Sequence, residues 1–104
     1  DTVDLIRSYP DRIGLVHIKQ MDPEVVQRVR RENLSFGEAV SLGVCVTPDA
    51  GQPKVGAVID ALAALDKELY VIVEQDLYPC APDVPLPLAI ETRRVLADNH
   101  LGIH

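Results

Sequence analysis

Two short apolar runs that do not alternate with polar residues constrain the fold of this chain more than any other feature. They are Ile13–Ile18 and Leu69–Val73, each about as long as a strand and rich in valine and isoleucine. A strand that is apolar on both faces is typical of a parallel sheet covered by helices. We therefore expect two parallel strands inside an α/β fold.

The segments around these runs carry helical patterns with start and stop signals. Asp22 followed by Pro23 is a helix start, and Ser35 followed by Glu38 is a capping box. The predicted helices cover Val3–Tyr9, Glu24–Arg31, the segment between Ser35 and Gly43, Val55–Leu65 and Pro85–Ala97. About fifty residues separate the two strands, which is ample for a right-handed crossover.

The length of 104 residues limits what two such strands can form. A two-stranded parallel sheet is not stable alone, because parallel sheets need several strands with both faces covered. We expect residues 1–104 to be a single partial domain of a larger α/β protein, or a chain whose copies associate to complete a sheet. A homo-oligomer that shields the strand edges is the expected state.

Charge and hydropathy exclude several classes of partner. The chain has 10 Lys and Arg against 16 Asp and Glu, a net charge of −6, whereas binding to nucleic acid needs a basic surface. This balance also disfavours an endonuclease-like enzyme with several metals. No apolar run approaches the ~20 residues that span a bilayer, and no signal peptide is visible. We expect no nucleic-acid partner, no membrane partner and a cytoplasmic location.

The cysteines support the same compartment. Cys45 and Cys80 are too few for a disulfide-stapled secreted domain. We therefore expect both to be reduced and structural, with a disulfide or a reactive thiol as the alternatives.

Polar side chains stand where each predicted strand ends. The first strand continues through His17 to Lys19, and the second is followed by Glu74 and Asp76. Because side chains alternate along a strand, His17 and Lys19 share one face, and so do Glu74 and Asp76. Ligands of α/β folds bind at the carboxyl ends of parallel strands. An imidazole and a carboxylate there form half of a divalent metal site.

The pattern alone leaves plainer interpretations open. A histidine within an apolar strand is more often a hydrogen-bonded core residue, and a glutamate after a strand is often its solvated end. On this interpretation, His17 and Glu74 would bind no metal.

The same residues resemble the xylose isomerase-like superfamily of sugar isomerases, epimerases and dehydratases, and within it the myo-inosose dehydratase-like proteins. The matching segments are Tyr9–Ile13 continuing into Leu15–Lys19, Pro23–Val25 onward, Asn33–Phe36 with Glu38–Val40, and Tyr70–Asp76. The resemblance covers nearly the whole chain and implies the C-terminal portion of a (β/α)8 TIM barrel. A full barrel takes ~250 residues, so the chain is shorter by roughly 150.

The resemblance also implies a metal and roles for particular residues. Family members hold one divalent ion, typically Mn, Co or Mg, with two carboxylates from earlier strands, a histidine and a final glutamate. It places that histidine at His17 and that glutamate at Glu74, so half of the ligand set is present. The metal is therefore expected in the full-length parent enzyme, and this chain alone is expected to be inactive. Lys19 is then the candidate to meet a substrate hydroxyl or stabilise an enolate, with a structural salt bridge as the alternative. Asp76 is a further candidate for substrate contact.

The chemistry implied is metal-assisted proton abstraction next to the carbonyl of a sugar or polyol, with Glu74 or its missing partner moving the proton. Isomerisation, epimerisation and dehydration share these first steps. Two features depart from the dehydratase-like pattern and bear on the choice of substrate, namely Gln20 in place of Asp and the longer loop Pro48–Pro53. The alternative function is a catalytically inactive fragment, with no bound metal, that serves only as a self-associating structural module.

Overall fold

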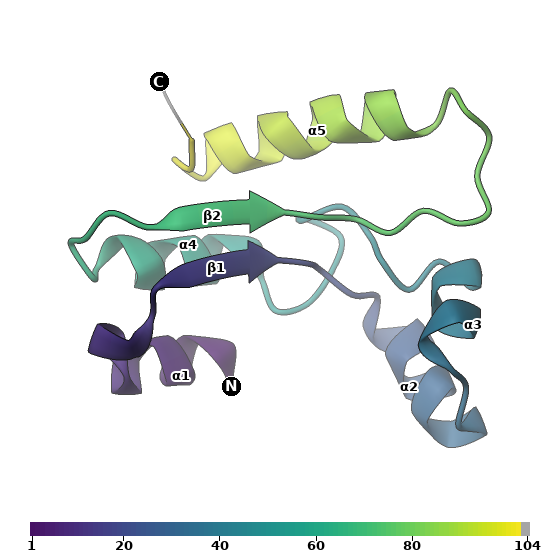
Figure 1. Ribbon diagram of the computed structural model, residues 1–104, viewed down its shortest axis with the longest axis horizontal. Coiled ribbons are helices and arrows are strands. Elements are labelled where there is room, and N and C mark those ends of the chain that lie inside the picture. Colours follow the sequence, from purple (N-terminus) through teal and green to yellow (C-terminus); the bar gives the residue numbers. More distant parts are fainter. Residues whose placement is uncertain (103–104) are drawn as a thin grey trace.

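The computed structural model describes residues 1–102, and Figure 1 shows their arrangement. Strand and helix alternate as the sequence predicts, which confirms the α/β class. The elements are α1 (Thr2–Ser8), η1 (Pro10–Arg12), β1 (Leu15–Ile18), α2 (Pro23–Glu32), α3 (Phe36–Ser41), α4 (Val55–Ala63), β2 (Tyr70–Val73) and α5 (Pro85–Asp98). The short 3-10 helix η1, which begins at a proline, is the one element that the sequence patterns did not indicate.

The two strands pair directly and run parallel, which confirms the predicted orientation. The register places Leu15 beside Tyr70 and Ile18 beside Val73. The ladder continues one step further, because the backbone N–H of Glu74 donates to the carbonyl of Ile18 at 3.1 Å. The residues that follow each strand therefore lie at the same edge of the sheet.

Helices cover one face of this sheet. The central core cluster joins β1 to α4 and α5 through Ile18, Val55, Ile59, Val95 and Leu96. A second cluster packs α1 against α4 around Ile6, Val58, Ala61 and Leu62. Ile18 is 4% exposed, as expected for a side chain that faces the helices. Burial of apolar area at this layer is what holds the strands in place.

The opposite face of the sheet is uncovered within residues 1–102. Leu15, Tyr70 and Ile72 on this face are 57%, 81% and 47% exposed. Each strand also has only one neighbour in the described part of the chain, so the outer edge of each is open. Two parallel strands with helices on one face are compatible with part of a (β/α)8 barrel.

Helices α2 and α3 form a hairpin beyond the carboxyl ends of the strands (Figure 1). Asp22 caps α2 by accepting from the backbone N–H groups of Glu24 and Val25. Ser35 and Glu38 form the reciprocal capping box that the sequence predicts at the start of α3. These caps fix where each helix begins and hold the hairpin next to the strand ends.

None of the helices within residues 1–102 has both the length and the apolar character needed to cross a membrane.

Candidate functional site

The four polar side chains predicted at the strand ends lie together in the structure. Nε2 of His17 is 2.9 Å from Oε2 of Glu74. Nζ of Lys19 is 2.6 Å from Oε1 of Glu74 and 2.6 Å from Oδ2 of Asp76. Alternation along two strands in parallel register is the reason, since it sends all four side chains to the face opposite the helices.

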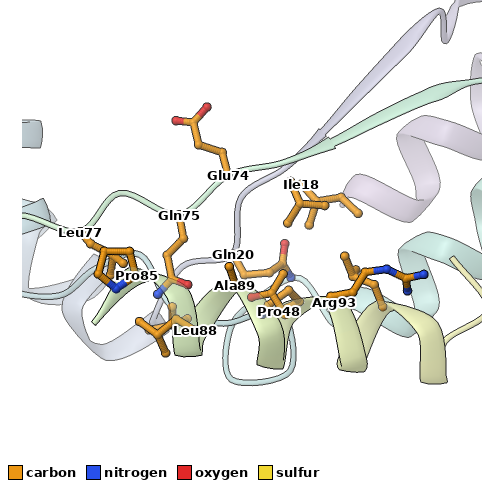
Figure 2. Close-up of a pocket in the computed structure, with 14 residues that line it drawn as sticks. Ile18, Gln20, Pro48, Glu74, Gln75, Leu77, Pro85, Leu88, Ala89 and Arg93 are labelled. Carbon is orange, nitrogen blue, oxygen red and sulfur yellow. The ribbon is translucent and has the colours of Figure 1, made fainter. Parts of the chain in front are cut away.

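Figure 2 shows which way Glu74 points. Its carboxylate is directed away from α5, whereas Gln75 points toward Leu88 of that helix. Gln75 also donates from Nε2 to the carbonyl of Cys45 at 3.3 Å. The side chains of these neighbouring residues thus point to opposite sides of the sheet, Glu74 to the uncovered face and Gln75 to the helix layer.

A cavity of about 400 Å³ lies on the helix side and is separate from the polar cluster. It opens between the end of β2 and α5, and its lining is mostly apolar (Figure 2). Glu74 is among its lining residues, but the carboxylate itself faces the other way. The charged chemistry therefore belongs to the open face and not to this cavity.

The ion pairs determine the electrostatics of the cluster. Hydrogen bonds from Lys19 to Asp76 and then to Glu74 raise the pKa of the lysine. The same contact with Lys19 is the main cause that lowers the pKa of Asp76. An ammonium group and an ionised Asp76 carboxylate are therefore held side by side at neutral pH.

His17 is not the buried histidine of the plainer interpretation. Its side chain is 45% exposed and that of Glu74 is 42% exposed, so both are accessible to a ligand. Two ligand atoms at right angles on an ion with bonds of ~2.1 Å lie ~3.0 Å apart. The His17–Glu74 separation of 2.9 Å is that of a direct contact between the two side chains, and it also equals the spacing of two adjacent ligands. Across residues 1–102, no group of three or more His, Cys, Asp or Glu side chains is arranged to hold a metal ion.

Two neighbours of the cluster were not predicted from the sequence. The ring centroid of Phe36 lies 5.5 Å from Nζ of Lys19, within the range of a cation–π contact. Sγ of Cys45 lies 3.8 Å from Oδ2 of Asp76. Both come from the connection between β1 and α4, and neither carries a local signal beyond its residue type.

The two departures from the dehydratase-like pattern contact each other. The buried side chain of Gln20 donates from Nε2 to the carbonyl of Pro53. The loop also pairs with Met21, whose backbone exchanges hydrogen bonds with Gln52. A Cβ on Gly51 would lie 2.7 Å from Cβ of Gln20, so only glycine permits this approach. Gln20 and the loop Pro48–Pro53 are thus parts of one packed unit behind the polar cluster.

We predict very different reactivity for the two free cysteines. Cys45 is buried, and this burial is the main cause that raises the pKa of its thiol, whereas Cys80 is exposed. Because the thiolate is the reactive form, Cys80 should react with Ellman's reagent at least about a hundredfold faster at neutral pH. The Cys80→Ser variant should lose the fast phase completely. A fast phase that persists in this variant would contradict the packing around Cys45.

The curated proteins compared here that this chain is similar to are bacterial proteins named inosose dehydratase. The chain is 32% identical over 99 residues to the inosose dehydratase of Clostridium tetani, covering 95% of this chain and 33% of that protein. It is 30% identical over 97 residues to that of Clostridium botulinum strain Eklund 17B, covering 93% and 32%. It is 35% identical over 79 residues to that of Geobacillus kaustophilus, covering 76% and 26%. No protein-family model and no solved structure matches.

The two clostridial matches cover nearly the whole chain, and all three agree with the resemblance described from the sequence. They do not cover the relatives to the same degree, because the chain spans about a third of the length of the curated proteins it matches. The chain is therefore similar, over almost all of its residues, to about one third of an inosose dehydratase.

Proposed function

We propose that this chain carries part of the active site of a divalent-metal-dependent sugar or polyol dehydratase, isomerase or epimerase, of the inosose dehydratase-like kind. One observation supports it above all. His17, Lys19, Glu74 and Asp76 meet at the carboxyl ends of two parallel strands, with contacts of 2.6 to 2.9 Å. About 30% identity to proteins named inosose dehydratase makes dehydration the favoured outcome.

His17 and Glu74 are the residues that would hold the metal ion, namely Mn, Co or Mg. Their nitrogen and oxygen atoms are accessible and spaced as adjacent ligands, and the remaining ligands would come from outside residues 1–102. When bound, the ion would supply a Lewis acid that polarises a substrate carbonyl.

Lys19 and the two carboxylates would carry the proton chemistry. Hydrogen bonds to Asp76 and Glu74 raise the pKa of Lys19, so the lysine stays protonated. Its ammonium group is therefore suited to donate a hydrogen bond to a substrate oxygen on which negative charge develops. Glu74 would accept the proton from the carbon next to the carbonyl. Asp76 would accept a hydrogen bond from a substrate hydroxyl. A proton returned to another carbon gives isomerisation or epimerisation. Return of the proton from Glu74 to a neighbouring hydroxyl, which then leaves as water, gives dehydration.

A second candidate function rests on the uncovered sheet face. Leu15, Tyr70 and Ile72 form an exposed apolar surface next to two open strand edges. Such a surface favours association with a second copy of the chain. In this alternative the 104 residues act only as a self-associating structural module, and His17 and Glu74 bind no metal.

Manganese titration of the purified 104-residue chain distinguishes the two candidates. We expect saturable Mn²⁺ binding, followed by the change in the electron paramagnetic resonance signal of free Mn²⁺. Because His17 and Glu74 are the proposed ligands, His17→Ala and Glu74→Gln should each weaken binding by about tenfold or more.

The matched control is Glu32→Gln, which removes an exposed carboxylate on α2 that is paired with Arg28. Its Mn²⁺ affinity should equal that of the unmodified chain. If the His17 and Glu74 variants bind Mn²⁺ as well as this control, the assignment of these two residues as metal ligands is wrong. If the unmodified chain binds no Mn²⁺, the structural-module alternative is favoured for the 104 residues.

A further inference from the structure

The cavity between the end of β2 and α5 lies on the side of the sheet opposite the polar cluster. Its volume of about 400 Å³ falls within the ~300–1,000 Å³ that is typical of sites for small organic molecules. Apolar side chains form most of its wall, among them Ile18, Val73, Leu88 and Leu96. Because such sites combine an apolar wall with a few orienting polar groups, the polar atoms of this wall determine which ligand fits.

Two glutamine amides in this wall are each fixed by one hydrogen bond. Nε2 of Gln20 donates to the carbonyl of Pro53, and Nε2 of Gln75 donates to the carbonyl of Cys45 at 3.3 Å. An amide held through its nitrogen keeps its oxygen Oε1 as an acceptor. Within residues 1–102 no donor is bonded to either Oε1. Figure 2 shows both side chains in the space between the strand ends and α5.

The amide of Gln20 is held inside the fold. The residue is only 5% exposed, and the close approach of Gly51 to its Cβ helps to fix it. Yet no fully buried side-chain nitrogen or oxygen within residues 1–102 lacks a partner, so Oε1 of Gln20 borders open space and not the packed core. An acceptor at such an enclosed place gains a hydrogen bond from any donor that enters.

The polar atoms of the wall favour a neutral donor over a charged group. A carboxylate would bring negative oxygens against the oxygens of the two amides, and a cationic amine would share the cavity with the guanidinium of Arg93. A primary amide carries no net charge and has two N–H donors. Its carbonyl oxygen is also an acceptor for the hydroxyl of Thr92, which lines the same cavity.

We propose that this cavity binds a small, neutral, largely apolar molecule through a primary amide, whose N–H groups donate to Oε1 of Gln20 and of Gln75. The site goes beyond the proposed function and does not depend on it. The carboxylate of Glu74 is directed away from α5, so the amide ligand and the chemistry of the polar cluster occupy opposite faces of the sheet.

Titration of the ¹⁵N-labelled 104-residue chain, followed by two-dimensional NMR, tests the site with benzamide as the probe. Benzamide should shift the side-chain amide signals of Gln20 and Gln75 saturably, with a dissociation constant of about 1 mM. Acetophenone has the same ring and carbonyl but a methyl group in place of the amide nitrogen, so it should bind about tenfold more weakly. Gln75→Leu should weaken benzamide binding about fivefold and should not weaken acetophenone binding.

Ala89→Phe is the variant that closes the cavity. Ala89 is exposed on α5 and lines the cavity, so a ring there fills its mouth and should weaken benzamide binding at least tenfold. Ala63→Phe is the matched control, because Ala63 is also exposed on a helix, α4, but lies outside the cavity wall. Its affinity for benzamide should equal that of the unmodified chain.

Several results would overturn the inference. Equal benzamide binding by the two variants would place the site elsewhere, and binding of acetophenone or benzoate as tight as that of benzamide would exclude the primary amide as the recognised group. Absence of saturable benzamide binding would exclude the site itself. Shifts of the same signals with protein concentration alone would show that a second copy of the chain covers the cavity. None of these results bears on the Mn²⁺ titration, which tests the proposed function separately.

Discussion

Replacing Ile59 with alanine is expected to lower the free energy of unfolding by about 2 to 5 kcal/mol. Ile59 lies on α4, is 5% exposed, and belongs to the cluster that joins β1 to α4 and α5. Truncation there removes buried apolar area and leaves a cavity between sheet and helices. Domains of this size have about 5 to 15 kcal/mol of stability, so the loss is a large fraction of the total. Urea unfolding followed by far-ultraviolet circular dichroism measures it.

The matched control is Ile90→Ala on α5, where the same side chain is 63% exposed. Its free energy of unfolding should change by no more than about 0.5 kcal/mol. Equal losses in the two variants would show that the layer between sheet and helices is not the main source of stability. The stability of this core also matters for the polar cluster. Ile18 belongs to the same core as Ile59, and it lies between His17 and Lys19 in the chain.

The elements and the pairing at the strand ends were predictable because their causes are local. Asp22 before Pro23 and the Ser35–Glu38 box each fix a helix start through bonds within four residues. Ile18 is buried, so alternation along the strand puts His17 and Lys19 on the other face. Because the strands are parallel neighbours, their residues end at the same edge of the sheet, and this brings Glu74 into contact with His17 and Lys19.

The rest of the site depends on contacts between residues far apart in the sequence. Gln20 bonds to Pro53, and Cys45 meets Asp76, across separations of 33 and 31 residues. Phe36 reaches Lys19 only because the α2–α3 hairpin folds back toward the strand ends. Periodicity and caps describe single elements, and they carry no information on how a hairpin or a long loop packs against another element.

The 104-residue chain is expected to self-associate through the uncovered face of its sheet. On the uncovered sheet face, Leu15 and Tyr70 lie beside each other in register at the amino-terminal end of the two strands, well exposed. Burial of these side chains and of the open strand edges favours a dimer or larger assembly of the 104-residue chain. Sedimentation velocity over the micromolar range should show an assembly larger than a monomer.

Tyr70→Lys should weaken this association by about thirtyfold or more, because burial of a charged lysine in an apolar interface is costly. Tyr78→Lys is the matched control. Tyr78 is 74% exposed, close to the 81% of Tyr70, but it follows β2 in the loop to α5 and lies off the apolar face. Since Tyr70 is mostly exposed, both variants should keep the circular dichroism of the unmodified chain. A monomeric unmodified chain would refute self-association, and equal weakening in the two variants would place the interface elsewhere.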